Sequence, residues 1–152
     1  MPAAIRPATL ADLPGALDLL RQLNPDDPDL PASTARAAWQ AMLGTQGLTV
    51  LVAEQAGALV GTCTLVVVPN LSRGARPYGV IENVVTDAAH RGQGIGHAVL
   101  GDAVQRAWAA GCYKVMLMTG STKPSTLQFY ESAGFEQSKT GFQIRRHPPR
   151  RE

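Results

Sequence analysis

The clearest candidate for a chemical function is a turn with three glycines near the middle of the chain. Residues 81–108 combine an apolar strand, a short polar loop, a turn with Gly92, Gly94 and Gly96, and an amphipathic helix. Such a turn leaves backbone N–H groups free at a helix N-terminus, where the helix dipole adds partial positive charge. Both features favour a bound phosphate or pyrophosphate. The stretch therefore predicts a site for a phosphate-bearing cofactor.

Two common phosphate-binding motifs do not fit this turn. A P-loop needs Lys-Ser or Lys-Thr after its glycines, and neither follows here. A dinucleotide-binding fingerprint counted from Gly92 needs a glycine where His97 stands, and no acidic residue follows about 20 positions later. The remaining pattern is Arg/Gln-x-x-Gly-x-Gly/Ala, which is satisfied by Arg91, Gly94 and Gly96.

Hydrophobic periodicity and turn residues predict the elements that must position this turn. Predicted strands lie at 4–7, 48–54, 58–68, 78–86 and 112–118, with a closing hairpin at 135–137 and 141–146. Predicted helices lie at 10–23, 33–43, 95–110 and 124–133. This order indicates an α/β fold of the α+β kind, with a mixed, mostly antiparallel sheet of six to seven strands and helices on both faces.

Composition sets the broad class of the protein. The 152 residues, 45% hydrophobic and 17% charged with a net charge of +2, favour one globular domain over 1–152, with a core of about 4–146 and a basic tail, 147–152. We expect that tail to be solvated rather than bound to nucleic acid. Cys63 and Cys112 lack metal-ligand spacing, so we expect no metal and a reducing, cytoplasmic setting. No signal peptide or membrane span is expected.

The Arg91–Gly96 pattern closely resembles the coenzyme A pyrophosphate loop of the GNAT N-acetyltransferases. Three other segments are similar to that superfamily: the opening 5–12, the strand IENVVTD at 81–87, and LQFYESAGF at 127–135. The second half is similar to glucosamine-6-phosphate N-acetyltransferases at 111–114, 129–131 and 143–145. It departs from them at Asn83, where that family has Asp, and at Met118, where that family has an acidic residue.

The resemblance implies a GNAT-like fold and transfer of the acetyl group of acetyl-CoA to a primary amine, with no metal. In that superfamily the central strand splays from the next one, which implies that the backbone of Val84, Val85 and Thr86 holds the pantetheine and acetyl group. One such N–H donor to a developing oxyanion can contribute about 3 kcal/mol. The resemblance also assigns the cofactor's pyrophosphate to Arg91, Gly92, Gln93, Gly94, Ile95, Gly96 and His97.

Two side chains are candidates for proton transfer. Glu82 is the only carboxylate inside an apolar strand, where burial would make it a usable base; it could equally bind the ammonium group or pair with an arginine. Tyr130 matches the superfamily tyrosine whose hydroxyl can protonate the leaving thiolate, although it could also be a core aromatic residue beside Phe129.

The acceptor is expected between the loop after the first helix and the loop at 69–77. The first loop offers Asp27, with Asp26 and Asp29, to a cationic amine; the second offers Arg73 and Arg76 to an anionic group. Asn83, next to the proposed base, is also assigned to the acceptor.

The sequence leaves three alternative interpretations open, and it also allows a homodimer. The Asp and Arg side chains of the two loops could be ordinary solvated charges. The chain could instead acetylate protein lysines or N-termini, or bind acyl-CoA without transferring anything. A homodimer could pair the strand edge at 142–146.

Overall fold

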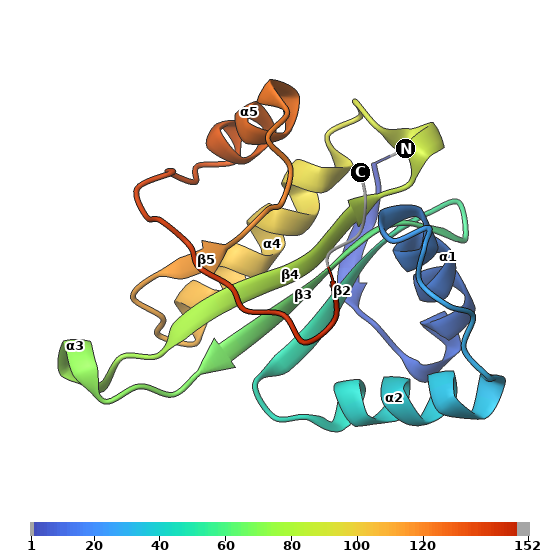
Figure 1. Cartoon of the computed structure of the whole chain (residues 1–152), viewed down its shortest axis with the longest axis horizontal. Helices are drawn as coiled ribbons and strands as arrows, with labels where there is room; N and C mark the ends of the chain where they lie inside the picture. The colour runs from blue at the N-terminus through green and yellow to red at the C-terminus, as the bar shows by residue number, and fades with distance from the viewer. Residues whose placement is uncertain (1, 149–152) are drawn as a thin grey trace. The chain divides into compact units, whose positions relative to one another are not determined.

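The computed structural model describes residues 2–148. The helices and strands of this part of the chain (Figure 1) are β1 (Ala4–Pro7), η1 (Leu10–Asp12), α1 (Leu13–Leu23), α2 (Ala32–Gly44), β2 (Leu48–Gln55), β3 (Ala58–Val68), α3 (Ser72–Ala75), β4 (Tyr78–Thr86), η2 (Ala88–His90), α4 (Ile95–Ala109), β5 (Val115–Leu117) and α5 (Pro124–Ser132). The chain divides into two units, Met1–Leu117 and Met118–Glu152. The first holds the whole sheet and the second holds α5. Of the predicted basic tail, residues 149–152 lie outside the described part.

The sheet has the strand order β1-β2-β3-β4-β5. The first four strands pair antiparallel, and β5 runs parallel to β4. A mixed, mostly antiparallel sheet is therefore confirmed. The predicted number of six to seven strands is wrong, because the described residues form five.

The missing strands are those of the predicted closing hairpin. Residues 135–137 and 141–146 adopt irregular backbone, and Phe142 and Ile144 are 91% and 100% exposed. Alternating apolar residues favour a strand only where a neighbouring strand and a buried face complete it. The fully exposed side chains show that this segment has no such face in the described chain. The predicted strand 112–118 is likewise shortened to Val115–Leu117.

Helices cover both faces of the sheet, as predicted (Figure 1). A Cβ atom added to Gly15 of α1 would meet the Leu59 side chain, whereas one added to Gly61 would meet Ile95 of α4. Leu59 and Gly61 are two positions apart on β3 and contact different helices, because the register between β2 and β3 shifts between their partners, Glu54 and Ala53. The fully buried side chains include Leu51, Val52, Leu65, Ile81, Val99 and Leu100. Each contributes about 1.5–3 kcal/mol by leaving water, so their burial stabilises the sheet that carries the loops at its ends.

Two further contacts hold the N-terminal elements to the sheet. Trp39 of α2 packs with Ala16 and Val50, and its indole N–H donates to the Thr9 carbonyl oxygen at 3.0 Å. The Arg6 guanidinium of β1 lies 2.7 Å from a carboxylate oxygen of Asp12 and 2.7 Å from one of Glu54. The hydrogen bonds from Arg6 hold the pKa of Asp12 down at about 2.

Candidate active site

The centre of the candidate site is an irregularity in β4. The register between β3 and β4 shifts between Thr62 and Thr64, and Asn83 adopts a left-handed backbone with φ of 54°. One residue of β3 thus faces two residues of β4, which is a β-bulge. Bulges re-aim side chains and are frequent beside active sites. This bulge lies directly after Glu82, the candidate base.

The pairing of β4 with β5 ends just before the bulge. Its last pair is Ile81 with Leu117, so residues 82–86 have only β3 as a strand partner within the described chain. The two strands therefore separate where the resemblance implies that a thioester would lie. Val85 is buried, whereas Val84 and Thr86 are half-buried. This exposed edge of β4 is where backbone groups could hold an extended ligand.

The structure exposes both Glu82 and Asn83. Burial of Glu82 was expected from the apolar strand around it, and the described structure does not provide it. The reason lies in the sheet: the pairing with β5 ends at Ile81 and Leu117, and the bulge at Asn83 directly follows Glu82. Glu82 is accordingly open to an incoming molecule.

The glycine turn has the backbone that the sequence predicted. Gly92 and Gly94 have φ values of 75° and 79°, which side chains rarely allow, and Gly94 is the N-cap of α4. Because glycine has no side chain, Gly94 offers no side-chain acceptor to the first-turn N–H groups. The first turn of α4 also carries no acidic residue. A helix end of this kind fits an anionic group such as a pyrophosphate.

The start of α4 is seated tightly on the sheet. Ile95 and Gly96 are buried, and Ile95 packs over Gly61 of β3. Arg91 is exposed, and its Nε donates to the Thr86 carbonyl oxygen at 3.4 Å. The Arg91 side chain thus contacts the last residue of β4, and residues 91–97 lie next to the end of that strand. Arg91, Gln93 and His97 are exposed on it.

The turn between β4 and Arg91 contains residues that the sequence reasoning missed. Asp87 caps η2 by accepting from the Ala89 N–H, and it lies 2.6 Å from Nδ1 of His90. Its other oxygen accepts from Nε2 of Gln22 at 2.7 Å. These hydrogen bonds, that from Gln22 first, hold the pKa of Asp87 below its usual range. An Asp before a helical turn signals a cap, but no local pattern indicates a partner 65 residues away.

The two groups of acceptor residues are not brought together. Asp27 belongs to the exposed loop between α1 and α2, and that loop lies on the other side of the first unit from α3 (Figure 1). Arg73 and Arg76 belong to the β3–β4 loop, and the Arg73 guanidinium lies 5.8 Å from the ring centre of Tyr113. From Tyr78 at the start of β4, Glu82 is four residues away, or about 13 Å along a strand. Tyr78, which follows this loop, is thus well separated from Glu82 along β4.

Tyr130 belongs to the second unit. It lies in α5, where its ring makes edge-to-face contacts with Phe129 at 5.0 Å and Phe135 at 6.3 Å between centroids. Lys123 precedes the helix and Pro124 opens it, as the sequence predicted. The aromatic contacts fix the orientation of the ring, which is half-buried.

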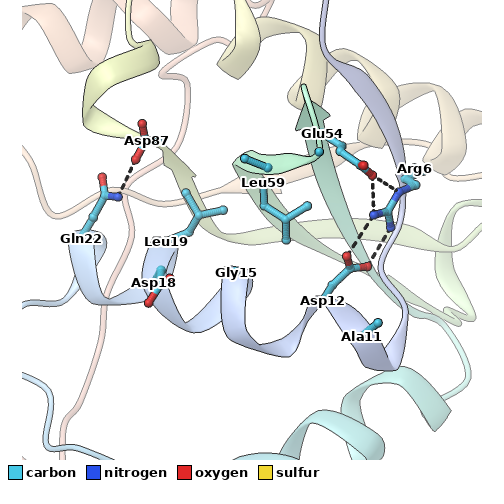
Figure 2. Close-up of a pocket in the computed structure, with 12 residues that line it drawn as sticks. Arg6, Ala11, Asp12, Gly15, Asp18, Leu19, Gln22, Glu54, Leu59 and Asp87 are labelled. Carbon is cyan, nitrogen blue, oxygen red and sulfur yellow. Dashed lines mark hydrogen bonds and ion pairs between the residues drawn. The ribbon is translucent and has the colours of Figure 1, made fainter.

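A pocket of about 490 Å³ lies between α1 and the β2–β3 turn, separate from the predicted site residues (Figure 2). Figure 2 shows Arg6, Asp12 and Glu54 joined at one end of it, and Gln22 bonded to Asp87 at the other. Because the Arg6 guanidinium is already engaged by two carboxylates, this pocket offers no free cation to an anionic ligand.

Two features of other classes of protein are absent from the described residues, 2–148. No helix among them is both long and apolar enough to cross a membrane. They contain no group of three or more His, Cys, Asp or Glu side chains placed to hold a metal ion.

Comparison with known proteins agrees with this arrangement. The sequence profile of the acetyltransferase (GNAT) family matches residues 16–135. A glucosamine 6-phosphate N-acetyltransferase of Trypanosoma brucei brucei is 34% identical over 125 residues, which are 82% of this chain and 83% of that protein. Glucosamine 6-phosphate N-acetyltransferase 1 of Oryza sativa subsp. japonica is 40% identical over 136 residues, 86% of this chain and 79% of that one.

A solved structure shares the fold closely. A protein of Agrobacterium tumefaciens str. C58, provisionally described as an acetyltransferase, is 53% identical with a TM-score of 0.92, over 94% of this chain and 99% of that chain. The chain therefore belongs to the acetyltransferase (GNAT) family. The expected enzyme class, an acyl-CoA-dependent N-acetyltransferase, is confirmed, as is the resemblance to glucosamine-6-phosphate N-acetyltransferases.

Proposed function

We propose that this single-domain enzyme transfers the acetyl group of acetyl-CoA to the primary amine of a small molecule, with an amino sugar phosphate as the first acceptor to test. The observation that carries the proposal is the continuity of β4 with the start of α4. The exposed edge after Ile81, the bulge at Asn83 and the glycine N-cap at Gly94 follow one another along 14 residues. The names of the two curated relatives support the acceptor class.

The residues of the first unit would hold the donor. When bound, acetyl-CoA supplies a thioester whose carbonyl carbon is open to attack by an amine. The N–H groups of residues 91–97 and the α4 dipole would bind its pyrophosphate, with the Arg91 side chain adding positive charge. The backbone of Val84, Val85 and Thr86 would bind the pantetheine, with one N–H aimed at the carbonyl oxygen.

Glu82 and Tyr130 would move the protons. An alkyl amine has a pKa near 10, so it arrives as ammonium and must lose a proton before it can attack. We assign Glu82 to this step, acting directly or through water, because its carboxylate is exposed beside the bulge. We assign the Tyr130 hydroxyl to protonation of the leaving thiolate.

The acceptor would lie beside Glu82 and Asn83. Asp27 could attract the ammonium group from the α1–α2 loop. Arg73 and Arg76 belong to the loop before Tyr78, which is about 13 Å along β4 from Glu82, so a small acceptor held at Glu82 would lie far from the backbone of that loop. We therefore expect the KM of a small amino sugar phosphate to be insensitive to Arg73→Ala and Arg76→Ala.

A thiol-release assay over a panel of acceptors tests the proposal. The purified chain is mixed with acetyl-CoA and, separately, with glucosamine 6-phosphate, amino acids, aminophosphonates and lysine-containing peptides. We expect enzyme-dependent release of coenzyme A with a small amine, and its loss in Glu82→Gln. Release with peptides alone would favour a protein acetyltransferase. Tight coenzyme A binding with no release over the panel would indicate a binding module.

We also propose that two copies associate in the cytoplasm. Phe142 and Ile144 alternate with polar residues and are almost fully exposed, which suits an edge strand paired across a dimer. The free thiols of Cys63 and Cys112 suit a reducing compartment. Light scattering should give twice the mass of one chain, and Ile144→Asp should lower the measured mass to that of a single chain. The matched control is Gln143→Asp, and a monomeric wild-type protein would contradict the dimer.

A further inference from the structure

Gln22, in the last turn of α1, is bonded to the turn that precedes the glycine loop (Figure 2). Its Nε2 donates to Oδ1 of Asp87 at 2.7 Å, and its Oε1 accepts from the Ala88 backbone N–H at 2.9 Å. Both hydrogen bonds join residues more than 60 positions apart in the sequence. A single exposed side chain thus ties the end of α1 to the first residues after β4.

The chemistry of the partners fixes which way the Gln22 amide points. The Asp87 carboxylate can only accept, and the Ala88 N–H can only donate, so the amide nitrogen must face the first and the amide oxygen the second. A glutamine satisfies both at once. A carboxylate at position 22 would place two negative charges against each other.

Asp87 also accepts hydrogen bonds from within the turn at residues 87–90. Its second oxygen accepts from Nδ1 of His90 at 2.6 Å and from the Ala89 N–H at 3.2 Å. Together with Gln22, three donors therefore surround one carboxylate. The backbone leaves this turn directly into Arg91 and the glycine loop.

Anchoring the turn before residues 91–97 should lower the conformational entropy that this glycine loop loses when it binds a ligand. Gly92 and Gly94 have no Cβ, and a Cβ atom built at either would meet nothing within 4 Å. Such a loop has more freedom to lose when it binds a ligand than other backbone does. Anchoring its N-terminal end lowers this cost before the ligand arrives.

We propose that Gln22 is a positioning residue for the donor site: it holds the turn at residues 87–90 so that the N–H groups of residues 91–97 are arranged for the cofactor's pyrophosphate. This inference rests on the proposed function, because it takes residues 91–97 as the coenzyme A loop. In this proposal Gln22 acts through the turn at residues 87–90, to which it is hydrogen-bonded, and not through a contact of its own with the cofactor.

The test exchanges the hydrogen-bonding polarity of the pair. Gln22→Glu removes the donor and sets two carboxylates together. Asp87→Asn sets an amide N–H₂ against another donor. In the double variant, the carboxylate at position 22 can accept from the new amide and from Ala88, while the amide oxygen at position 87 can accept from Ala89 and His90. The matched control is Asp18→Asn, an exposed residue one turn earlier on α1 that lines the same pocket.

Two quantities are measured. The first is the Kd for coenzyme A, by calorimetry. The second is the hydrogen-exchange rate of the backbone amides of residues 88–97 in the protein without ligand. We expect Gln22→Glu to weaken binding about tenfold and to speed exchange, Asp87→Asn to do so less, and the double variant to return within about threefold of wild type. The control should match wild type, and thermal stability should change little because Gln22 is exposed.

Each outcome decides between the two claims. A Gln22→Glu protein with wild-type affinity and exchange would overturn the positioning role while leaving the proposed function in place. A double variant no better than the weaker single variant would overturn it too. A wild-type protein that binds no coenzyme A would remove the proposed function and this inference together.

Discussion

Gly61 of β3 and Ile95 of α4 meet so closely that β3 has no room for a side chain beneath the start of that helix. A Cβ atom at Gly61 would stand 2.9 Å from Cγ2 of Ile95 and 3.5 Å from the Val85 carbonyl oxygen. The glycine therefore sets the height of the helix N-terminus above the sheet. Since that N-terminus is the proposed pyrophosphate site, packing in the core and binding at the surface are linked through one contact.

Gly61→Ala should push the start of α4 away from β4. Overpacking of this kind costs about 1–3 kcal/mol of the free energy of unfolding, and we expect the Kd for coenzyme A to rise as well. Thermal unfolding and calorimetry measure the two effects. The control is Gly101→Ala in the same helix, where nothing lies within 4 Å and a gain of about 0.5–1 kcal/mol is expected. Unchanged affinity in Gly61→Ala would contradict the link.

Asn83→Val should break the bulge that presents Glu82. A β-branched residue at a φ of 54° costs about 1–3 kcal/mol, so the backbone should change rather than remain in place. We expect kcat to fall at least tenfold, with the Kd for coenzyme A less affected. Asn83→Gly tolerates the same φ but also removes the amide assigned to the acceptor, so kcat should stay well above that of Asn83→Val while the KM of the acceptor rises. Equal rates in the valine and glycine variants would show that the bulge is not needed.

Tyr130→Phe keeps the ring that packs against Phe129 and Phe135 and removes only the hydroxyl. If the hydroxyl protonates the leaving thiolate, kcat should fall by about 10²–10⁴-fold, while the Kd for coenzyme A and the melting temperature stay near wild type. Steady-state kinetics and calorimetry separate these quantities. A variant with the wild-type rate would leave Tyr130 as a packing residue.

The ion pairs of Arg6 predict how stability depends on pH. The pKa of Asp12 is about 2 in the folded chain and near 3.9 in an unfolded one, so its contribution, about 2.5 kcal/mol, is complete above the unfolded value. It should be lost as the pH falls from about 4 to 2. Denaturant unfolding at several pH values should therefore show a shallower decline in Asp12→Asn. The exposed pair of Arg21 and Asp29 supplies the control, Asp29→Asn, which should follow wild type.

Helices and strands whose bounds depend only on nearby residues could be predicted from the sequence. The boundaries of β3 and β4 were predicted residue for residue, because an apolar run bounded by turn residues leaves little choice. The start of α4 followed from the glycines before Ile95. Local rules failed for residues 141–146, whose alternation resembles a strand but finds no partner in the described chain.

Features that depend on distant contacts could not be predicted. The bond between Gln22 and Asp87 joins residues 65 apart, and nothing near either residue signals the other. The left-handed Asn83 lies in a strand pattern that shows no sign of a bulge. The exposure of Glu82 follows from where β5 stops pairing, which is a property of the sheet rather than of the strand's own residues.

The most direct test of the central claim is the mass of the product formed from acetyl-CoA labelled with ¹³C in the acetyl carbonyl. With glucosamine 6-phosphate or another small amine from the panel, the account predicts one labelled acetyl group on the amine nitrogen for each coenzyme A thiol released. Glu82→Gln should form far less of this product. The absence of labelled amine across the whole panel, with coenzyme A still bound at residues 91–97, would contradict the account.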